Sequence, residues 1–442
     1  MGVDAAIHRT MKLSIYNSAI NINNKHTLLY NSFSGKFVVV KNLLISLNDL
    51  SIDTLCREYN AIYNQLIDAS IIIENNVDEI SLLKERIYNA DNNEHEYILH
   101  INPTLDCNFR CWYCYEKHIP NSRMNQETLN STLLYISSIL QKPSIKSFEL
   151  GFFGGEPLFF FNSIAKVIIS HTHSLCKELN KSLHIHFTSN GALLNEDIIK
   201  FLSKFSCGFQ ITLDGGKDSH DKTRFNKNNT GSFDTIIQNI LRLVQSGIEV
   251  IVRVNYTSDN VDSIYSVYES FKTINETYKK FIKFDFQRVW QDRIDRFDET
   301  ENKVKVIRQN FITANFIVLT NYIPHDVRNS CYGDKHNHVL INYNGDIFGC
   351  TARDFTPENR IGFIDNFGVI HYDSAIIYKR NNSKLSKPIC NKCRIAPICG
   401  GGCKQRAFES LNSEECTFNY SEEEIDNMIM EIFEYSFCMN SK

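Results

Sequence analysis

Three cysteines lie close together in the segment Cys-Asn-Phe-Arg-Cys-Trp-Tyr-Cys, at Cys107, Cys111 and Cys114. The apolar run of residues 97–101 precedes them and predicts a short buried strand that opens into a cysteine loop. Three thiolates at this spacing can hold three corners of a four-iron cluster, which leaves one iron as an open coordination site. Two other interpretations remain: a zinc site with His118 as the fourth ligand, and reduced structural thiols.

The composition of the chain narrows the class of protein. Its 442 residues, 43% of them hydrophobic, are enough for two or three domains with their own cores. The formal net charge of −4 argues against a nucleic-acid partner, and no long run of like charge points to a membrane surface. With no signal peptide and no apolar stretch of about 18 residues, we expect no transmembrane helix. Fourteen cysteines without a secretion signal indicate the reducing cytoplasm, where clustered cysteines usually bind metal.

Strand and helix patterns alternate between about residues 96 and 325. The expected strands cover 97–102, 147–153, 183–188, 208–213, 248–255 and 281–289. The expected helices cover 126–141, 162–181, 194–205, 233–246, 259–274 and 300–322. Such alternation implies a parallel sheet with helices outside, and six units predict an α/β fold of the partial (β/α)6 TIM barrel type. In these barrels the chemistry lies at the C-terminal ends of the strands, where the cysteine loop falls.

Further candidate site residues follow the next strands. The second strand ends in Gly154-Gly155-Glu156-Pro157, the third in Thr188-Ser189-Asn190-Gly191 and the fourth in Thr212-Leu213-Asp214-Gly215. Glycines let a backbone approach a ligand closely, and a glutamate offers an acceptor. The first two segments could also be ordinary turns. Arg253 and Asn255, on the fifth strand, are candidates for a substrate pocket.

The C-x3-C-x-Tyr-C pattern of residues 107–114, with Gly-Gly-Glu-Pro after the next strand, resembles the radical S-adenosylmethionine (AdoMet, SAM) enzymes. The resemblance implies that the three cysteines hold a [4Fe-4S] cluster and that AdoMet chelates its open iron. Reductive cleavage of AdoMet then yields a 5′-deoxyadenosyl radical, which abstracts a hydrogen atom from the substrate.

The same resemblance implies which residues bind the cofactor. They are Tyr113 within the signature, Gly154, Gly155, Glu156 and Pro157 at the AdoMet amino group, Ser189 and Asn190 on the ribose side, and Thr212 and Arg224 at the carboxylate. Arg224 suits that role because its planar fork can pair with a carboxylate at two points.

The first 92 residues contain no cysteine cluster and predict a small unit of their own. Strand patterns cover 12–22, 26–40 and 69–73, with turns at Asn23-Asn24 and Ser34-Gly35, and helical patterns cover 51–69 and 78–89. This order fits a winged-helix-like unit, and a structural cover for the barrel fits it equally well. Many radical AdoMet enzymes that modify ribosomal peptides begin with such a unit. The resemblance therefore implies that residues 1–92 bind the leader of a precursor peptide by strand addition.

Cysteines are dense again in the C-terminal part of the chain. They are Cys331, Cys350, Cys390, Cys393, Cys399, Cys403 and Cys416. Strands on either side of Asn344-Gly345 predict a hairpin that brings Cys350 back toward Cys331. The C-x2-C and C-x3-C pairs could bind two zinc ions. The whole order, however, resembles the SPASM extension of radical AdoMet enzymes.

The SPASM resemblance implies two auxiliary [4Fe-4S] clusters, and three clusters in all. One would be held by Cys390, Cys393, Cys399 and Cys416, and the other by Cys331, Cys350 and Cys403. The second set is one ligand short. Its fourth iron is either open or bound by Cys438, by a histidine such as His336 or His338, or by substrate.

Taken together, the resemblance implies domains at 1–92, 93–325 and 326–442. It implies a radical SAM/SPASM maturase that crosslinks residues of a ribosomally synthesised peptide, by a carbon–carbon or thioether bond, with flavodoxin or ferredoxin as electron donor. The alternative is a sulfatase-maturase-like enzyme that makes formylglycine. Those enzymes carry Asp directly after the cysteine that matches Cys350, where this chain has Thr351. A zinc-stabilised binding module would leave residues 154–157 and Arg224 without a purpose.

Overall fold

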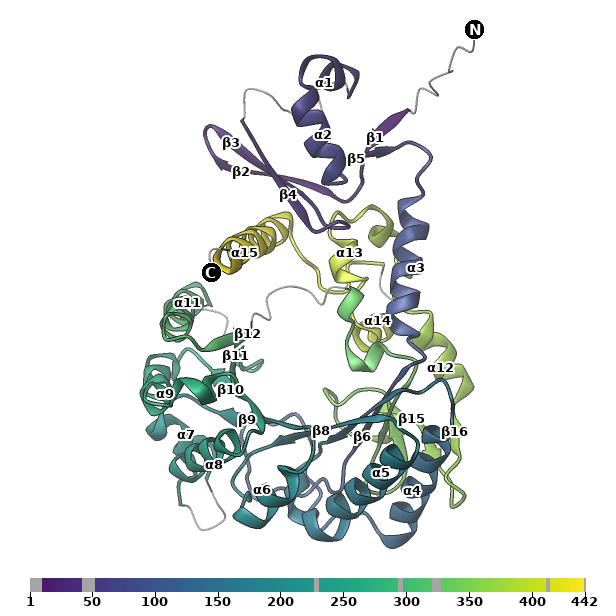
Figure 1. Cartoon of the computed structure of the whole chain (residues 1–442), viewed down its shortest axis with the longest axis vertical. Coiled ribbons are helices and arrows are strands. Elements are labelled where there is room, and N and C mark those ends of the chain that lie inside the picture. Colours follow the sequence, from purple (N-terminus) through teal and green to yellow (C-terminus); the bar gives the residue numbers. More distant parts are fainter. Residues whose placement is uncertain are drawn as a thin grey trace. The chain divides into compact units, whose positions relative to one another are not determined.

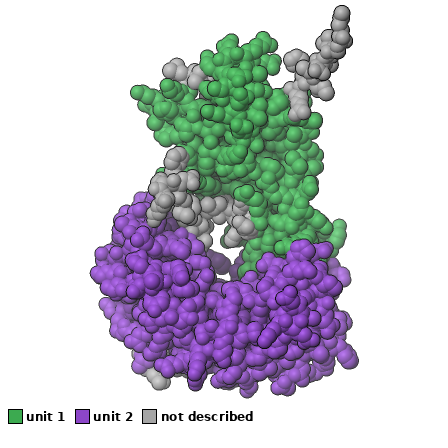
Figure 2. Space-filling view, viewed as in Figure 1, with its two compact units in different colours: residues 1–93, 322–336, 378–442 green, residues 94–321, 337–377 purple. Residues whose placement is uncertain are grey.

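The computed structural model describes residues 10–41, 52–225, 230–292, 297–319, 327–410 and 414–440. The chain forms two compact units, each made from separate stretches of sequence (Figure 2). Unit 1 comprises 1–93, 322–336 and 378–442, and unit 2 comprises 94–321 and 337–377. This division does not coincide with the predicted boundary at 325/326, because residues 337–377 pack with the parallel sheet. The three-domain scheme therefore stays a prediction about functional parts.

Unit 2 is built on one sheet whose central strands are parallel and lie in chain order, with helices along its outer side (Figure 1). These strands are β6 (Glu96–Ile101), β7 (Ser147–Phe152), β8 (Ser182–Ser189), β9 (Cys207–Leu213), β10 (Glu249–Tyr256), β11 (Ile282–Arg288) and the short β12 (Ile317–Leu319). The six expected strands are confirmed to within one residue at each end. The predicted α/β class is confirmed, and closure as a (β/α)6 barrel stays a prediction.

The helices of unit 2 correct the sequence expectations at several places. They are α4 (Gln126–Leu140), α5 (Lys166–Glu178), α6 (Glu196–Leu202), α7 (Lys217–Thr223), α8 (Phe233–Gln245), α9 (Tyr265–Phe271), α10 (Glu276–Lys279) and α11 (Phe297–Thr313). Helix α7 was not expected, because its polar sequence lacks apolar periodicity. Helix α10 was not expected either, and α9 covers only the middle of the helix expected over 259–274. The helix expected over 300–322 ends at Thr313, because Asn315 has a left-handed backbone with φ 62° and the chain turns into β12. Residues 320–322 lie outside the described residues.

The two faces of this sheet differ in chemistry, because successive side chains of a strand point to opposite sides. Phe152, Phe187 and Phe209 lie at matched positions of β7, β8 and β9, and their ring centroids are 4.7 and 5.0 Å apart. Phe161, just before α5, packs against Phe187 from the helical layer. The next residue of β8, Thr188, points to the inner face and lines a cavity. The outer face thus anchors the helices, and the inner face is left for chemistry.

Four strands from the C-terminal part extend the sheet beyond β6. β13 (His338–Ile341) runs parallel to β6, and β14 (Asp346–Phe348), β15 (Arg360–Ile364) and β16 (Ile370–Tyr372) continue in antiparallel order. The predicted hairpin at Asn344-Gly345 is confirmed, and Gly345 adopts the positive φ of 85° that this turn requires.

Unit 1 begins with two small antiparallel sheets, β1 (Met11–Leu13) with β5 (Ile72–Glu74), and the meander β2 (Asn17–Asn23), β3 (His26–Asn31) and β4 (Lys36–Lys41). Its described helices are α1 (Ile52–Glu58), α2 (Asn60–Asp68), α3 (Glu79–Asp91), α13 (Ala396–Cys399), α14 (Lys404–Glu409) and α15 (Glu422–Asn440), while α12 (Ser374–Asn381) spans the unit boundary. The two predicted turns are confirmed, but each of the two longer expected strands is a pair of strands. The helix expected over 51–69 is two helices, and Ser51 lies outside the described residues. The winged-helix-like character of residues 1–92 stays a prediction. None of the helices among the described residues could span a membrane.

A buried ion network ties α3 to the cysteine-rich part of unit 1. Lys384 Nζ lies 3.1 Å from an oxygen of Asp91, at the end of α3, and 3.2 Å from an oxygen of Asp334. All three side chains are at most 7% exposed. Asp334 also accepts a hydrogen bond from the backbone N–H of Lys404 at 2.6 Å, and Ser330 donates to Asp91 at 2.7 Å. The network thus joins α3 to the segments that carry Cys331 and Cys403.

Replacing Lys384 with Ala should leave both carboxylates buried without their shared cation. We expect the free energy of unfolding to fall by about 3–5 kcal/mol, measured by urea unfolding followed by circular dichroism. The exposed Lys25, in the β2–β3 turn, gives the matched control, since Lys25→Ala should change stability by less than about 0.5 kcal/mol. An equally small effect of K384A would show that the network does not hold α3.

The cysteine loop is fixed by backbone contacts with the end of β7. The backbone N–H of Gly155 donates to the carbonyl of Thr104 at 3.1 Å, and that of Glu156 donates to the carbonyl of Asp106 at 2.9 Å. A Cβ added at Gly154 would lie 2.4 Å from the Thr104 oxygen, and one added at Gly155 would lie 2.2 Å from the Asp106 oxygen. The two glycines therefore permit close approach to the cysteine loop itself, a use that the sequence pattern did not distinguish from approach to a ligand.

Gly155→Ala should push the cysteine loop away from β7, because the added methyl group meets backbone atoms that cannot rotate aside. We expect the iron content after anaerobic reconstitution to fall by about one four-iron cluster per chain. Gly208→Ala is the control, because its Cβ would meet nothing closer than 3.7 Å. Circular dichroism checks that both variants are folded. Unchanged iron in a folded G155A would contradict this account of the loop.

Candidate cofactor site

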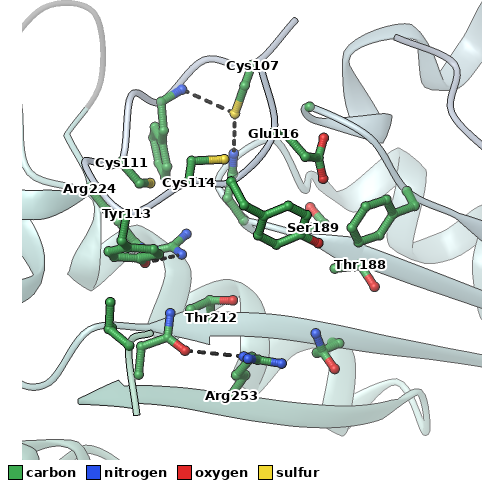
Figure 3. Close-up of a pocket in the computed structure, with 18 of the residues that line it drawn as sticks. Cys107, Cys111, Tyr113, Cys114, Glu116, Thr188, Ser189, Thr212, Arg224 and Arg253 are labelled. Carbon is green, nitrogen blue, oxygen red and sulfur yellow. Dashed lines mark hydrogen bonds between the residues drawn. The ribbon is translucent and has the colours of Figure 1, made fainter. Parts of the chain in front are cut away.

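The ends of neighbouring parallel strands meet around one cavity in unit 2 (Figure 3). The predicted residues that line it are Cys107, Cys111, Tyr113, Cys114, Gly154, Gly155, Ser189, Asn190, Thr212 and Arg224, together with the pocket candidates Arg253 and Asn255. Glu156 and Pro157 are buried behind this lining. Residues far apart in sequence come together here because parallel strands present their carboxyl ends at one edge of the sheet.

Glu156 holds two strand ends together. Its fully buried carboxyl group accepts hydrogen bonds from the Ser189 hydroxyl at 2.8 Å and from the backbone N–H groups of Asn190 at 2.8 Å and Leu158 at 3.0 Å. Burial raises the pKa of Glu156 to about 7, although these hydrogen bonds favour its ionised form. The predicted acceptor is thus engaged with protein groups, and it positions Ser189 and Asn190 at the cavity.

The three cysteines of the loop differ in environment. Cys107 is buried, and its sulfur accepts hydrogen bonds from the backbone N–H of Phe109 at 3.4 Å and the side-chain amide of Asn190 at 3.8 Å. Burial raises the pKa of the Cys107 thiol to about 12. Cys111 is partly buried, and Cys114 is exposed, with its sulfur 3.5 Å from His118 Nε2. A buried sulfur that receives two N–H donors is suited to the negative charge of a metal-bound thiolate.

The donor set fits a cluster better than a single ion. Within the described ranges, no three His, Cys, Asp or Glu side chains converge as ligands of one metal ion. The zinc interpretation with His118 as fourth ligand would need such convergence. A four-iron cluster has a different requirement, because each thiolate binds its own iron and the sulfurs therefore stay apart. Cys107, Cys111 and Cys114 all line this cavity, so the donor set is compatible with such a cluster.

Arg224 has a buried counter-charge that the sequence patterns did not assign. Its Nε lies 3.0 Å from a carboxylate oxygen of Asp214 and 3.0 Å from the Tyr113 hydroxyl, which in turn lies 2.7 Å from Asp214. Both ends of the salt bridge are less than a tenth exposed. Asp214 directly follows β9, two residues after the predicted site residue Thr212. The guanidinium group of Arg224 thus carries a charge that the protein already balances.

Four C-terminal cysteines of unit 1 form a second set. Burial, followed by the neighbouring thiols, raises the pKa values of Cys390 and Cys399, and both feel the charge of Cys416. Cys393 also raises the pKa values of Cys390 and Cys399 by electrostatic repulsion. The backbone N–H groups of residues 401–402 favour the Cys399 thiolate, although burial raises its pKa to about 12. This environment fits the predicted four-cysteine cluster, which stays a prediction.

The predicted three-cysteine set is divided between the units, since Cys331 and Cys403 belong to unit 1 and Cys350 to unit 2. The Cys350 sulfur accepts a hydrogen bond from a backbone N–H at 3.3 Å, as Cys107 does. Among the candidate fourth ligands, His338 is buried in β13 with its Nε2 3.1 Å from His100 Nδ1. The side chain of Cys438 lies outside the described residues. Their grouping around one cluster stays a prediction.

Several cavity residues escaped the sequence patterns. Trp290 stacks on Tyr115 with ring centroids 6.0 Å apart, and both line the cavity. Glu116 lines it too, and one oxygen of its carboxyl group is buried without a hydrogen-bond partner in the described structure. Burial raises the pKa of Glu116 to about 8. In the sequence, only the position of Glu116, two residues after Cys114, indicated that it could belong to the site. Trp290 belongs to none of the sequence motifs.

Parts of this chain are similar in sequence to known proteins. A sequence model of the Radical SAM superfamily matches residues 101–271, which include the cavity-lining ends of β6 to β9. The chain is 24% identical over 375 residues to the cysteine-type anaerobic sulfatase-maturating enzyme of Clostridium novyi (strain NT), which covers 76% of this chain and 92% of that protein. It is 23% identical over 370 residues to the radical SAM cyclopropyl synthase TigE of Paramaledivibacter caminithermalis, over 76% of this chain and 68% of TigE.

The fold is also similar to that of a solved structure, Streptococcus suis SuiB bound to the precursor peptide SuiA. The match has a TM-score of 0.52 and 14% sequence identity, and it covers 92% of this chain and 97% of SuiB. The superfamily implies AdoMet and a [4Fe-4S] cluster as cofactors, for which the cavity supplies three cysteines at the expected strand end. Residues 101–271 thus match the Radical SAM superfamily, and the chain is similar in sequence to both an anaerobic sulfatase-maturating enzyme and the cyclopropyl synthase TigE.

Proposed function

We propose that this protein is a radical SAM/SPASM maturase that crosslinks residues of a ribosomally synthesised peptide. In this proposal Cys107, Cys111 and Cys114 hold the catalytic cluster. When bound, the cluster and AdoMet together supply a 5′-deoxyadenosyl radical that removes a hydrogen atom from the peptide. Forming a crosslink removes a second electron and a proton, so the overall reaction is a two-electron oxidation.

The protein's own residues bind and orient the cofactor. The backbone at Gly154 and Gly155 faces the cavity and is proposed to receive the AdoMet amino group. Ser189 and Asn190, held from behind by Glu156, take the ribose side. Thr212 and the buried pair of Arg224 and Asp214 take the carboxylate side, with Tyr113 fixing the guanidinium group by a hydrogen bond of 2.6 Å.

The C-terminal cysteines give the oxidation an electron acceptor. We propose that Cys390, Cys393, Cys399 and Cys416 hold one auxiliary [4Fe-4S] cluster and that Cys331, Cys350 and Cys403 hold the other. Such clusters can take the electron left by the substrate and return it to a small donor protein such as flavodoxin or ferredoxin. The electrostatic interactions among Cys390, Cys393, Cys399 and Cys416 support the assignment of the first of these two clusters.

A single observation carries the choice of a peptide substrate. The likeness to SuiB, solved with its precursor peptide, extends over 92% of this chain. In unit 1 the sheet order β2-β3-β4 leaves each outer strand with one paired side within that sheet. A peptide leader can add to such an edge through main-chain hydrogen bonds. We therefore propose that the unit of residues 1–92 binds the leader.

Formylglycine formation is the second candidate, because the C. novyi relative is a sulfatase-maturating enzyme. The position that resembles the Asp of those enzymes is Thr351, which is buried, with its carbonyl accepting a hydrogen bond from the Tyr115 hydroxyl at 2.9 Å. A threonine here cannot accept a proton as a carboxylate does. This difference favours the crosslinking proposal.

The proposed function is tested by anaerobic coexpression with each short open reading frame that neighbours the gene, followed by high-resolution mass spectrometry. We expect one peptide to lose two hydrogen atoms, with fragmentation showing two joined residues. A sulfatase-derived peptide that contains cysteine is the second arm. Its conversion to formylglycine, with every neighbouring peptide unchanged, would replace the first proposal with the second.

The triple variant C107A/C111A/C114A tests the assignment of the catalytic cluster. It should lose AdoMet cleavage entirely while keeping the iron of both auxiliary clusters, because the other cysteines are untouched. 5′-Deoxyadenosine formation and iron content give the two readouts. The matched control is Cys176→Ala, a buried cysteine on α5 that is remote from the cavity lining. AdoMet cleavage by the triple variant would refute the assignment.

A further inference from the structure

The cavity wall carries an excess of positive charge. Three guanidinium groups line it, those of Arg224, Arg253 and Arg288, against one carboxyl group, that of Glu116. Arg253 and Arg288 lie on the strands β10 and β11, and Arg224 directly follows helix α7. Their partners decide how much of each positive charge the protein itself already balances.

Two of the three arginines are already neutralised by carboxylates of the protein. Arg224 lies 3.0 Å from Asp214. Arg288 lies 2.7 Å from Asp292 and 3.7 Å from a second carboxylate, that of Glu301. Arg253 differs: its Nε donates to the neutral side-chain oxygen of Asn255 at 3.2 Å, and no carboxylate of the described residues lies within 4 Å of it. Its charge is balanced in part by the buried carboxyl group of Asp285, which lies beyond 4 Å on the neighbouring strand.

The surroundings of Arg253 present it to the cavity. It lies on β10 directly beside Thr212 of β9, and both side chains line the cavity. On the other side, Asp285 of β11 is its register partner, and that buried carboxyl group turns to Gln287 at 2.7 Å. Arg253 thus lies between Thr212 on one strand and Asp285 on the other, with the amide of Asn255 two residues further along β10. Its planar guanidinium group is suited to two-point pairing with a carboxylate.

The cofactors of the proposed function are assigned to other residues than Arg253. An oxidised [4Fe-4S] core with three thiolates would carry one net negative charge, and AdoMet chelated through a neutral amine and its carboxylate would add none, so the net negative charge would lie at the cysteines. Figure 3 shows Arg253 at the opposite end of the cavity from Cys107, with Thr212 between them. The AdoMet carboxylate is proposed to lie at Arg224 and Thr212, on the cysteine side of Thr212, whereas Arg253 lies on the other side of Thr212.

We propose that Arg253, flanked by Thr212 and Asn255, binds a carboxylate of the peptide substrate and so selects which residue reaches the radical. The inference rests on the proposed function and gives it a substrate class: peptides with an acidic side chain, or a free C-terminus, near the modified residue. Arg253 is a positioning residue, since it holds the substrate and does not touch the reacting hydrogen.

Protection from phenylglyoxal tests the site without catalysis. Reconstituted full-length protein, saturated with AdoMet, is treated with this arginine reagent, and modification of Arg253 is followed by peptide mapping, with the exposed Arg57 as internal reference. The probes are acetyl-Gly-Asp-Gly-amide, its Asn counterpart, and acetyl-Gly-Gly-Gly with a free carboxyl group. We expect a carboxylate probe to slow the modification about fivefold at near saturation, and the Asn probe to have no effect.

The arms separate the sources of the carboxylate. Protection by the Asp probe points to a side chain, and protection by the free-carboxyl probe points to a C-terminus. Protection by AdoMet alone, with no further effect of any probe, would overturn the proposal in favour of the cofactor carboxylate. No protection by any carboxylate would also overturn it.

Arg253→Gln and Arg253→Lys extend the test to the peptide found by coexpression. R253Q should keep uncoupled AdoMet cleavage within about twofold and reduce peptide product at least about tenfold, and R253K should lie between, because it keeps the charge without the fork. Equal product from R253Q and the native protein would refute the inference. If the native protein modifies no peptide, the proposed function fails, whereas the protection result is unaffected.

Discussion

The backbone of the cysteine loop lies against the backbone at the end of β7, with only glycine between them. Because added Cβ atoms at Gly154 and Gly155 would lie within 2.4 Å of carbonyl oxygens, the loop and the strand end can approach only when both side chains are absent. Two hydrogen bonds then fix the register of the loop, and with it the direction from which Cys107, Cys111 and Cys114 face the cavity. The geometry of any cluster on these cysteines is set by this contact.

The contact is extended by a buried carboxyl group. Glu156 follows the glycines directly and accepts hydrogen bonds from the next strand end, so three strand ends are joined through main-chain atoms and one side chain. Burying a carboxylate is costly unless it is hydrogen-bonded, and three donors offset that cost. After the next strand, β9, the buried carboxylate of Asp214 is likewise paired: it accepts hydrogen bonds from Arg224 and from the Tyr113 hydroxyl. Both devices let polar groups line a cavity without leaving buried charges unpaired.

The sequence predicted the strands of unit 2 well because each one is a short apolar run between polar segments, and such runs depend on local sequence alone. It predicted the cavity residues as a set because parallel strands bring their carboxyl ends together. It could not predict that Glu156 is buried behind the cavity lining, since Ser189 and Asn190, which hold it there, lie at the end of another strand. It also could not predict α7, whose polar residues form a helix without apolar spacing. Nor could it predict the end of α11, which is followed by the left-handed backbone of Asn315. These features depend on contacts or backbone angles that no local pattern encodes.

Unit 1 is made from both ends of the chain, and this has a consequence for the order of folding. Tyr30 of β3 packs in one core with Ile425 and Ile429 of α15, and Ser32 donates a hydrogen bond to the carbonyl of Arg394. During synthesis, strand β3 therefore waits for helix α15 before this core can close, whereas the parallel strands of unit 2, which lie between them in the sequence, are made earlier. The outer strands β2 and β4 each keep one side that is unpaired within their sheet, so an extended segment that paired with them before α15 was made could hinder the closing of this core.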